Sequence, residues 1–357
     1  MTTQQKLEKT LAELVAIPSV SGDSEACHKV VEYVRNRLAS HNLFIRGDFE
    51  GRNPWFIATT QDTNTPDILL AAHLDVVPAK EYKMEQHDGK LYGRGVYDMK
   101  LAAACYLELF EAHAEQLANL NIGLLFTTDE ELGGPLMPEV LATGLRPKMV
   151  FIPDGGDNWQ IEERAKGFYH TRLTARGKAS HGSRPWEGDN AVHRLIEVLD
   201  TLHQSFPGKQ PADSTLTITS FRGGDAMNQT PDHATATIDF RSFSLDDLAA
   251  HKDQTRKLAK ANNIEVEILQ QGHPLILDKQ SPAIQDFLTT LQNFTNQDIH
   301  YTESYGGTDG RFFAPYNIPC IIVEPQGGGR HADDEWLLAE DFYRYYQLIE
   351  SWILSQA

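Results

Sequence analysis

Residues 68–75 read Ile-Leu-Leu-Ala-Ala-His-Leu-Asp, a short apolar run that ends in a polar triplet. An apolar run of this length is typical of a strand buried on both faces, as in a parallel sheet. Similar runs lead into acidic or histidine residues at 122–131, 149–154 and 320–331. Helical spacing of apolar residues lies between them, from about residue 99 and near residues 137–141. The alternation predicts an α/β domain with a mixed, largely parallel sheet.

A different pattern begins near residue 167. Alternating polar and apolar residues predict half-exposed antiparallel strands at 169–174, 215–220 and 235–240. Helical patterns at about 190–202 and 245–261, with a strand near 266–269, complete a β-α-β-β-α-β order, which predicts a ferredoxin-like α+β domain. The α/β pattern then resumes. We therefore expect one discontinuous domain of residues 1–166 and 273–357, interrupted by a second domain of residues 167–272.

Composition excludes several classes of protein. The 357 residues are 41% hydrophobic, which is ordinary for a globular chain, and the net charge is −18. An acidic surface repels phosphate backbones and anionic lipids, so we expect neither nucleic acid nor membrane partners. No signal core opens the chain, and a cytoplasmic protein is the expectation. Three scattered cysteines argue against a disulfide framework and are expected to be buried thiols: Cys27, Cys105 and Cys320.

Polar residues collect where the predicted strands end. In open α/β sheets this edge is where ligands bind. Each group alone has an ordinary explanation, such as a surface histidine, a solvated turn or a helix cap, but together they would repel one another unless cations bound them. Mixed nitrogen and oxygen ligands suit zinc, with cobalt or manganese as substitutes, and a bridging carboxylate suits two ions. The groups are His73, Asp75, Asp98, Glu130, Glu131, Asp154 and His331.

The ordered motifs resemble a known family. The sequence is similar to the co-catalytic zinc hydrolases that include glutamate carboxypeptidase, aminoacylase, acetylornithine deacetylase, succinyl-diaminopimelate desuccinylase and bacterial dipeptidases. This resemblance runs nearly end to end and implies a catalytic di-metal domain with an inserted lid or dimerisation domain. The motifs that carry it are His73-Leu74-Asp75, Gly93-Arg94-Gly95 with Asp98-Met99-Lys100, Glu130-Glu131, Asp154, Ala179-Ser180-His181-Gly182-Ser183, Gly306-Gly307-Thr308-Asp309-Gly310-Arg311 and His331.

The resemblance also implies roles for the residues at the sheet edge. Asp98 would bridge two zinc ions and be followed by a cis peptide bond. Asp75 would accept the second ring N–H of His73 and fix its tautomer. Glu130 would be the general base that takes a proton from the water between the ions. The terminal metal ligands would be His73, Glu131, Asp154 and His331.

Residues of the second domain and of the glycine turn complete the expected site. The resemblance implies that His181 crosses from the partner subunit of a homodimer to stabilise the oxyanion. The glycine turn lacks the Gly-Lys-Ser/Thr ending of a phosphate-binding loop, which disfavours a phosphate site. The resemblance further implies that the carboxylate or carbonyl of the substrate is held by Asn228, Arg241, Gly306, Gly307 and Thr308.

One ligand position bears on the substrate. Deacylases and carboxypeptidases of the family usually carry Glu where this chain has Asp154, whereas dipeptidases usually carry Asp. We therefore expect a metallopeptidase or amidohydrolase that cleaves a linear amide bond in a small dipeptide or N-acyl amino acid with a free carboxylate, and the dipeptide ranks first. The alternative is a deacylase of the acetylornithine deacetylase or succinyl-diaminopimelate desuccinylase type. A non-catalytic binding relative is disfavoured because Glu130 and all five ligands are present.

Overall fold

The computed structural model describes residues 1–357, which divide into two compact units. The larger unit comprises residues 1–163, 277–303 and 308–357, and the smaller unit comprises residues 164–276 and 304–307. The sequence predicts an insert of residues 167–272, and the boundaries of the smaller unit at residues 164 and 276 lie a few residues outside it. The short segment 304–307 groups with the smaller unit, where the Lys166 amide donates to the Ser304 carbonyl at 3.0 Å.

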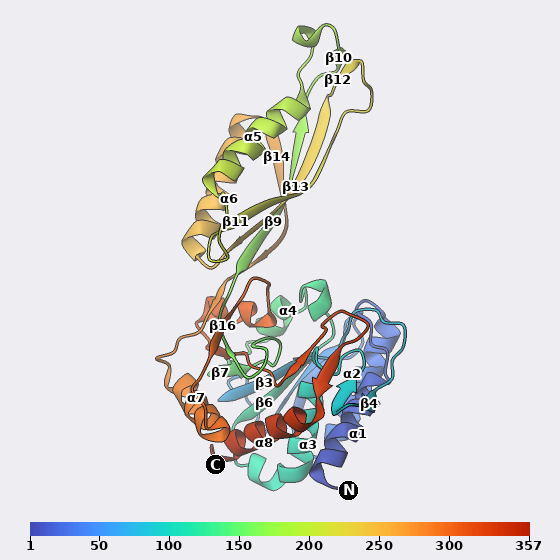
Figure 1. The fold of residues 1–357 in the computed structure, drawn as a ribbon, viewed down its shortest axis with the longest axis vertical. Coiled ribbons are helices and arrows are strands. Elements are labelled where there is room, and N and C mark those ends of the chain that lie inside the picture. Colours follow the sequence, from blue (N-terminus) through green and yellow to red (C-terminus); the bar gives the residue numbers. More distant parts are fainter. The chain divides into compact units, whose positions relative to one another are not determined.

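A six-stranded sheet forms the centre of the larger unit (Figure 1). Its order is β1-β2-β6-β3-β7-β17. The four strands from β6 to β17 are parallel, while β1 and β2 pair antiparallel at one edge. The predicted mixed, largely parallel sheet is therefore observed. The strands are β1 (Phe44–Asp48), β2 (Trp55–Thr59), β3 (Ile68–His73), β6 (Ile122–Thr127), β7 (Met149–Phe151) and β17 (Cys320–Ile321).

The register of the parallel strands brings their carboxyl ends to one edge. His73 at the end of β3 lies opposite Thr127 at the end of β6, and Leu70 of β3 lies opposite Phe151 at the end of β7. All three strands are buried along their whole length, which explains their continuous apolar runs. The polar residues that follow these strands are thus placed at a common edge.

Six helices belong to the larger unit, and α3 packs directly on β3. Thr2 forms a capping box with Gln5 at the start of α1, and Asp23 caps α2. No helix of the chain is both long enough and apolar enough to cross a bilayer. The three cysteines are buried and unpaired, as expected. The helices are α1 (Thr3–Val15), α2 (Ser24–Leu38), α3 (Lys100–Leu117), α4 (Met137–Ala142), α7 (Pro282–Thr295) and α8 (Ala339–Leu354).

Short strands were not predicted from the sequence. A small antiparallel sheet has the order β18-β19-β5-β4. Three more strands lie near the points in the sequence where the chain passes from one unit to the other. The bounds are β4 (Glu85–His87), β5 (Lys90–Tyr92), β18 (Gly327–Gly328) and β19 (Trp336–Leu338), then β8 (Ile161–Ala165), β15 (Leu275–Ile276) and β16 (Tyr301–Ser304).

The smaller unit has the predicted β-α-β-β-α-β order. Its four antiparallel strands follow the spatial order β11-β13-β9-β14, and α5 and α6 pack on one face around a single apolar core (Figure 1). A two-stranded ribbon of β10 and β12 extends from it. The elements are β9 (Gly167–Arg176), β10 (Ser180–His181), α5 (Ala191–Ser205), β11 (Thr215–Gly223), β12 (Gln229–Thr230), β13 (His233–Ser242), α6 (Leu245–Ala261) and β14 (Ile264–Gly272).

A histidine is enclosed in this core. The ring of His251 on α6 stacks on Phe240 with 4.0 Å between centroids and meets the edges of Tyr169 and Phe206. It is fully buried, and burial lowers its pKa from 6.5 to about 4. The folded chain therefore keeps this imidazole neutral, whereas the unfolded chain takes up a proton below about pH 6.5.

This difference predicts that acid destabilises the smaller unit through His251. Its contribution to stability is complete above pH 6.5 and is lost as the pH falls toward 4, with about 2 kcal/mol lost between pH 7.5 and 5. Urea unfolding at the two pH values should show a smaller loss for His251→Phe, which keeps the stacking without the proton site. The variant His203→Gln, at an exposed position of α5, is the control and should behave like the wild type. Equal pH dependence in His251→Phe would refute the assignment.

Candidate metal centre

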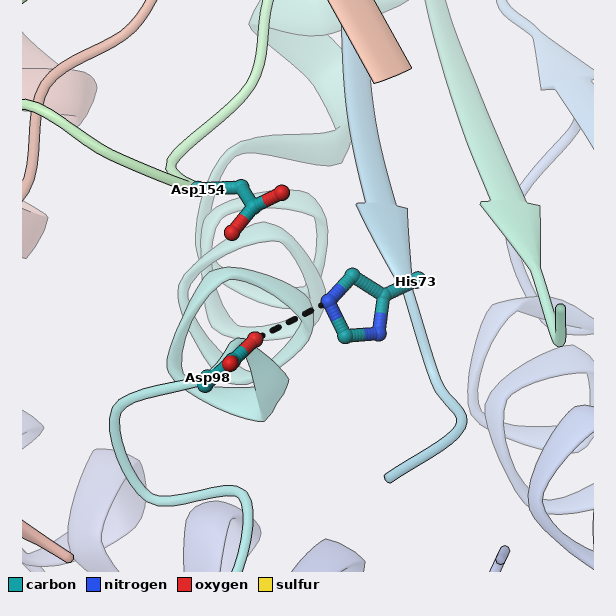
Figure 2. Close-up of side chains that lie close together, drawn as sticks. All are labelled: His73, Asp98 and Asp154. Carbon is teal, nitrogen blue, oxygen red and sulfur yellow. Dashed lines mark hydrogen bonds and ion pairs between the residues drawn. The ribbon is translucent and has the colours of Figure 1, made fainter. Parts of the chain in front are cut away.

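Three predicted ligands converge at the carboxyl edge of the sheet (Figure 2). His73 ends β3, Asp98 precedes α3, and Asp154 follows β7. Each offers one ligand atom, and these atoms lie within 4.8 Å of one another. His73 Nε2 lies 3.1 Å from Asp98 Oδ1, and both residues are buried. The peptide bond after Asp98 is cis, as the resemblance implied.

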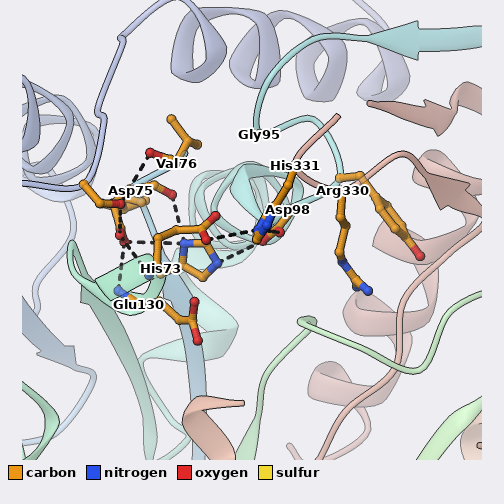
Figure 3. Close-up of polar contacts among 12 residues, drawn as sticks. His73, Asp75, Val76, Gly95, Asp98, Glu130, Arg330 and His331 are labelled. Carbon is orange, nitrogen blue, oxygen red and sulfur yellow. Dashed lines mark hydrogen bonds and ion pairs between the residues drawn. The ribbon is translucent and has the colours of Figure 1, made fainter. Parts of the chain in front are cut away.

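A second group of three shares Asp98 (Figure 3). His331 Nε2 lies 3.3 Å from Asp98 Oδ2 and 3.0 Å from Glu131 Oε2. His331 is half exposed and has a φ of 62°, an uncommon backbone conformation for a residue other than glycine. The two oxygens of Asp98 thus face two different histidines, each in a separate three-ligand group.

The donor set fits divalent metal ions. Burial and the charge of Asp98 raise the pKa of Asp154, and the same two causes raise that of Glu131 to about 7. Carboxylates brought this close oppose one another's ionisation, and a cation between them removes that cost. Imidazole and carboxylate ligands in two adjoining groups, with one carboxylate common to both, suit a pair of zinc ions.

Asp75 connects His73 to the turn that carries Glu130. The Nδ1 atom of His73 lies 2.9 Å from the main-chain oxygen of Asp75 and 3.5 Å from its carboxylate, so the closer acceptor is the backbone. The Asp75 carboxylate instead accepts from the amides of Glu130 and Glu131, each at 3.3 Å, and from the Ser21 hydroxyl at 2.6 Å (Figure 3). Asp75 therefore holds His73 through its backbone oxygen and the acidic turn through its side chain.

Glu130 lies beside the first ligand group. With His73, Asp154 and Asp309 it lines a small cavity whose other walls are mainly apolar. Burial, together with the charges of Asp154 and Asp309, raises the pKa of the Glu130 carboxyl well above its ordinary value. A raised pKa makes this carboxylate a stronger proton acceptor, which suits a general base that later acts as an acid.

The predicted residues of the smaller unit form two separate groups. His181 pairs with Gln229 across the β10–β12 ribbon, and the Gly182 amide donates to the Asn228 carbonyl at 2.7 Å. Both His181 and Asn228 are exposed. They lie at the end of the unit where β13 begins.

Arg241 lies near the other end of β13. Its Nε donates to both oxygens of Asp239 at 3.1 and 3.0 Å, and its Nη1 donates to the Tyr305 carbonyl at 3.2 Å. The latter bond brings Arg241 next to Gly306. A Cβ at Gly306 would meet only the Ser304 hydroxyl, at 3.8 Å, so local packing does not demand glycine there.

The remaining residues of the glycine turn are Gly307, which is exposed, and Thr308, which is buried. Thr308 caps a short 3-10 helix, Asp309–Phe312, through its hydroxyl. The predicted substrate groups are therefore not one cluster. Asn228 precedes β13, whereas Arg241 lies about 26 Å along that strand from its start at about 3.3 Å per residue.

Sequence reasoning missed a charged cluster next to His331. Arg330 forms ion pairs with the fully buried Glu324 and, at 3.0 Å, with Asp157, and its guanidinium lies over the ring of Tyr97. The position of Arg330 directly before His331 was a sequence signal that could have placed it near the metal centre. The partners could not be identified, because they come from distant segments.

Comparison with known proteins identifies the family to which the chain belongs. The model of peptidase family M20/M25/M40 matches residues 69–355. A succinyl-diaminopimelate desuccinylase from Marinobacter nauticus is 26% identical over 371 aligned positions, which cover 95% of each chain. A probable carboxypeptidase from Aspergillus flavus is 31% identical over 263 positions, 64% of this chain and 61% of the relative.

The fold is also found among solved structures. A tripeptidase from Staphylococcus aureus superposes with a TM-score of 0.83 at 19% identity, covering 99% of this chain and 98% of the other, which confirms the predicted fold class. The family match spans most of the chain and includes the whole metal centre. The chain therefore belongs to peptidase family M20/M25/M40 and is a metallohydrolase that acts on amide bonds.

Proposed function

We propose that this chain uses two zinc ions to remove the acyl group from a small N-acyl amino acid with a free carboxylate. The observation that supports a two-ion centre is the position of the Asp98 carboxylate between two histidines. One of its oxygens lies 3.1 Å from His73 and the other lies 3.3 Å from His331. The ligands would be His73, Asp154 and Asp98 for one ion, and Asp98, Glu131 and His331 for the other. Cobalt and manganese are expected substitutes for zinc.

Two observations bear on the substrate and favour different classes. The end-to-end likeness to a protein named as a succinyl-diaminopimelate desuccinylase favours an N-acyl amino acid. The shorter ligand Asp154, which ranked dipeptides first in the sequence, favours a dipeptidase. We place the deacylase first because the relative's likeness extends over 95% of both chains, whereas Asp154 is a single position.

A substrate panel distinguishes these classes. N-succinyl, N-acetyl and N-formyl amino acids and unblocked dipeptides would be assayed with zinc, cobalt and manganese. We expect an N-acyl amino acid to have the highest kcat/KM. A dipeptide that exceeds every acylated substrate by tenfold or more would reverse the ranking and establish the dipeptidase.

In the proposed reaction, Glu130 transfers a proton and Asp75 holds the groups around it in position. When bound, the two ions would supply Lewis-acid polarisation of the amide carbonyl and a lowered pKa for the attacking water. Glu130 takes a proton from that water as the carbon–oxygen bond forms, and returns it to the nitrogen as the carbon–nitrogen bond breaks. Asp75 holds the amide of Glu130 and the ring of His73, so both keep their places during the transfer.

Arg241 is the proposed partner of the substrate carboxylate. Asp239 fixes its Nε, and His170 Nε2 contacts the same carboxylate at 3.0 Å. Burial acts to raise the pKa of Asp239, but the hydrogen bonds from His170 and Arg241 lower this pKa below its ordinary value. The Asp239 carboxylate therefore stays charged. A guanidinium held at Nε presents its terminal nitrogens in one orientation, which suits paired hydrogen bonds to a carboxylate.

Arg241→Ala should therefore lower kcat/KM on free-acid substrates by tenfold or more. A hydrogen bond between charged groups contributes about 1.5 to 3 kcal/mol, and the variant loses it. Amidating the substrate carboxylate should produce a similar loss in the wild type and little further loss in the variant. Equal cleavage of free and amidated substrates by the wild type would contradict the carboxylate pocket.

The chain is proposed to act as a homodimer. His181 and Arg241 lie at opposite ends of the smaller unit, so one copy does not bring both to one substrate. Two apolar side chains are exposed near His181: Trp186 at 77% and Met227 at 107%. A second copy could cover them while receiving His181 to stabilise the oxyanion.

Subunit mixing tests this arrangement. Glu130→Gln and His181→Ala chains should each be inactive, but mixing them should restore up to about a quarter of the wild-type turnover, because half of the dimers then hold one intact site. Each variant incubated alone is the control. No recovery after verified subunit exchange would show that His181 does not act across the dimer.

A further inference from the structure

Two loops supply the ligands that do not follow a strand of the central sheet directly. Residues 93–98 carry Asp98, and residues 329–335 carry His331. His73, by contrast, is the last residue of β3 and is held by the sheet. The geometry of the second ligand group therefore depends on what keeps these two loops together.

Glu335 binds the first loop through its backbone. Its Oε1 accepts from the amides of Gly95 and Tyr97, both at 2.9 Å, and from the amide of Asp98 at 3.1 Å. Gly95 has a φ of 88°, a conformation favoured by glycine, and a Cβ there would approach Lys100 and Val76 at 3.0 Å. One carboxylate oxygen thus gathers three donors, including the amide of the shared ligand itself.

Arg94 binds the second loop. Its Nη1 donates to Glu335 Oε2 at 2.7 Å and its Nη2 donates to the Ala332 carbonyl at 2.9 Å, one residue beyond His331. The Gly93 amide adds a bond to the Glu335 carbonyl at 3.1 Å. Arg94 and Glu335 are 5% and 1% exposed, so water does not compete with these bonds.

We propose that the buried Arg94–Glu335 pair is a positioning device that sets the separation of Asp98 and His331 and so determines the affinity of the second metal ion. This inference rests on the proposed two-ion centre. Two of the three ligands in the His331 group depend on the pair, whereas in the His73 group only Asp98 does. Loss of the pair should therefore lower the affinity of the chain for the second ion more than its affinity for the first.

Glu335→Gln tests the proposal with little change in size. If its amide oxygen accepts from the three backbone donors, its NH2 group faces Arg94 Nη1, and the opposite orientation places the NH2 group against the three amides. Either orientation sets donor against donor. We expect a loss of 10- to 100-fold in affinity for the second cobalt ion, the usual effect of removing a partner that orients metal ligands, and a smaller loss for the first.

The measurement is a cobalt titration of the metal-free full chain, followed by visible absorption and calorimetry, with the thermal midpoint of the metal-free form recorded. Asp333→Asn is the matched control, since Asp333 lies in the same loop and forms an exposed ion pair with Lys80. The control should bind both ions like the wild type. Excess cobalt should restore kcat in Glu335→Gln if the pair only positions ligands.

The possible failures are distinguishable. A wild-type chain that binds fewer than two cobalt ions would overturn the proposed two-ion centre. A Glu335→Gln chain that binds both ions with wild-type affinity and spectrum, even at a lowered thermal midpoint, would overturn the positioning role alone. If Glu335→Gln does not fold, Arg94→Lys decides, because lysine cannot bond Glu335 and Ala332 with a planar fork. A wild-type affinity for the second ion in Arg94→Lys would then refute the proposal.

Discussion

Glu130→Gln is expected to lose turnover by at least about 100-fold while keeping two metal ions per chain. The amide has the shape of the carboxylate but cannot accept a proton from water and return it to the leaving nitrogen. Glu130 belongs to neither ligand group, so the ions should remain. Steady-state turnover and metal analysis of the same preparation give both numbers.

Glu139→Gln, on the exposed surface of α4, is the matched control and should keep wild-type turnover. If Glu130→Gln kept a tenth of the wild-type kcat, another group would have to be the base. If it lost metal as well as turnover, Glu130 would be a ligand rather than a proton carrier.

Asp98→Ala should have the next largest effect, because Asp98 alone belongs to both ligand groups. The variant leaves two ligands in each group, and we expect it to retain less than one ion per chain and no measurable turnover. His331→Ala removes a ligand from one group only and should retain about one ion. Metal content after dialysis against a weak chelator measures the difference.

His193→Ala, on the exposed surface of α5, controls for the loss of a histidine and should retain both ions. Equal metal content in Asp98→Ala and His331→Ala would contradict the shared role of Asp98, whatever the activity of either variant.

The sequence identified the parallel strands and their polar ends because both are local signals. The apolar run at β3 and the His73-Leu74-Asp75 triplet are adjacent, and the structure keeps them adjacent. The predicted helix 245–261 has the observed bounds of α6 for the same reason, since its capping Ser244 and its periodicity lie within one segment.

Local sequence patterns could not predict the contacts between distant segments of the chain. Arg94 and Glu335 are 241 positions apart, and neither has a spacing that marks it as a partner of the other. The edge strand β1 has an irregular burial pattern, and its pairing with β2 defines it better than its own sequence does. The separation of Asn228 from Arg241 depends on the strand β13 between them, whereas the resemblance implied only that both bind substrate.

The most direct test of the account is zinc add-back to the metal-free wild-type chain, with bound zinc and hydrolysis of an N-acyl amino acid measured on the same samples. We predict no turnover without metal, and turnover that rises until two ions are bound per chain. Full turnover in the metal-free chain, or a maximum at one bound ion with no second binding step, would contradict a centre in which two zinc ions share Asp98.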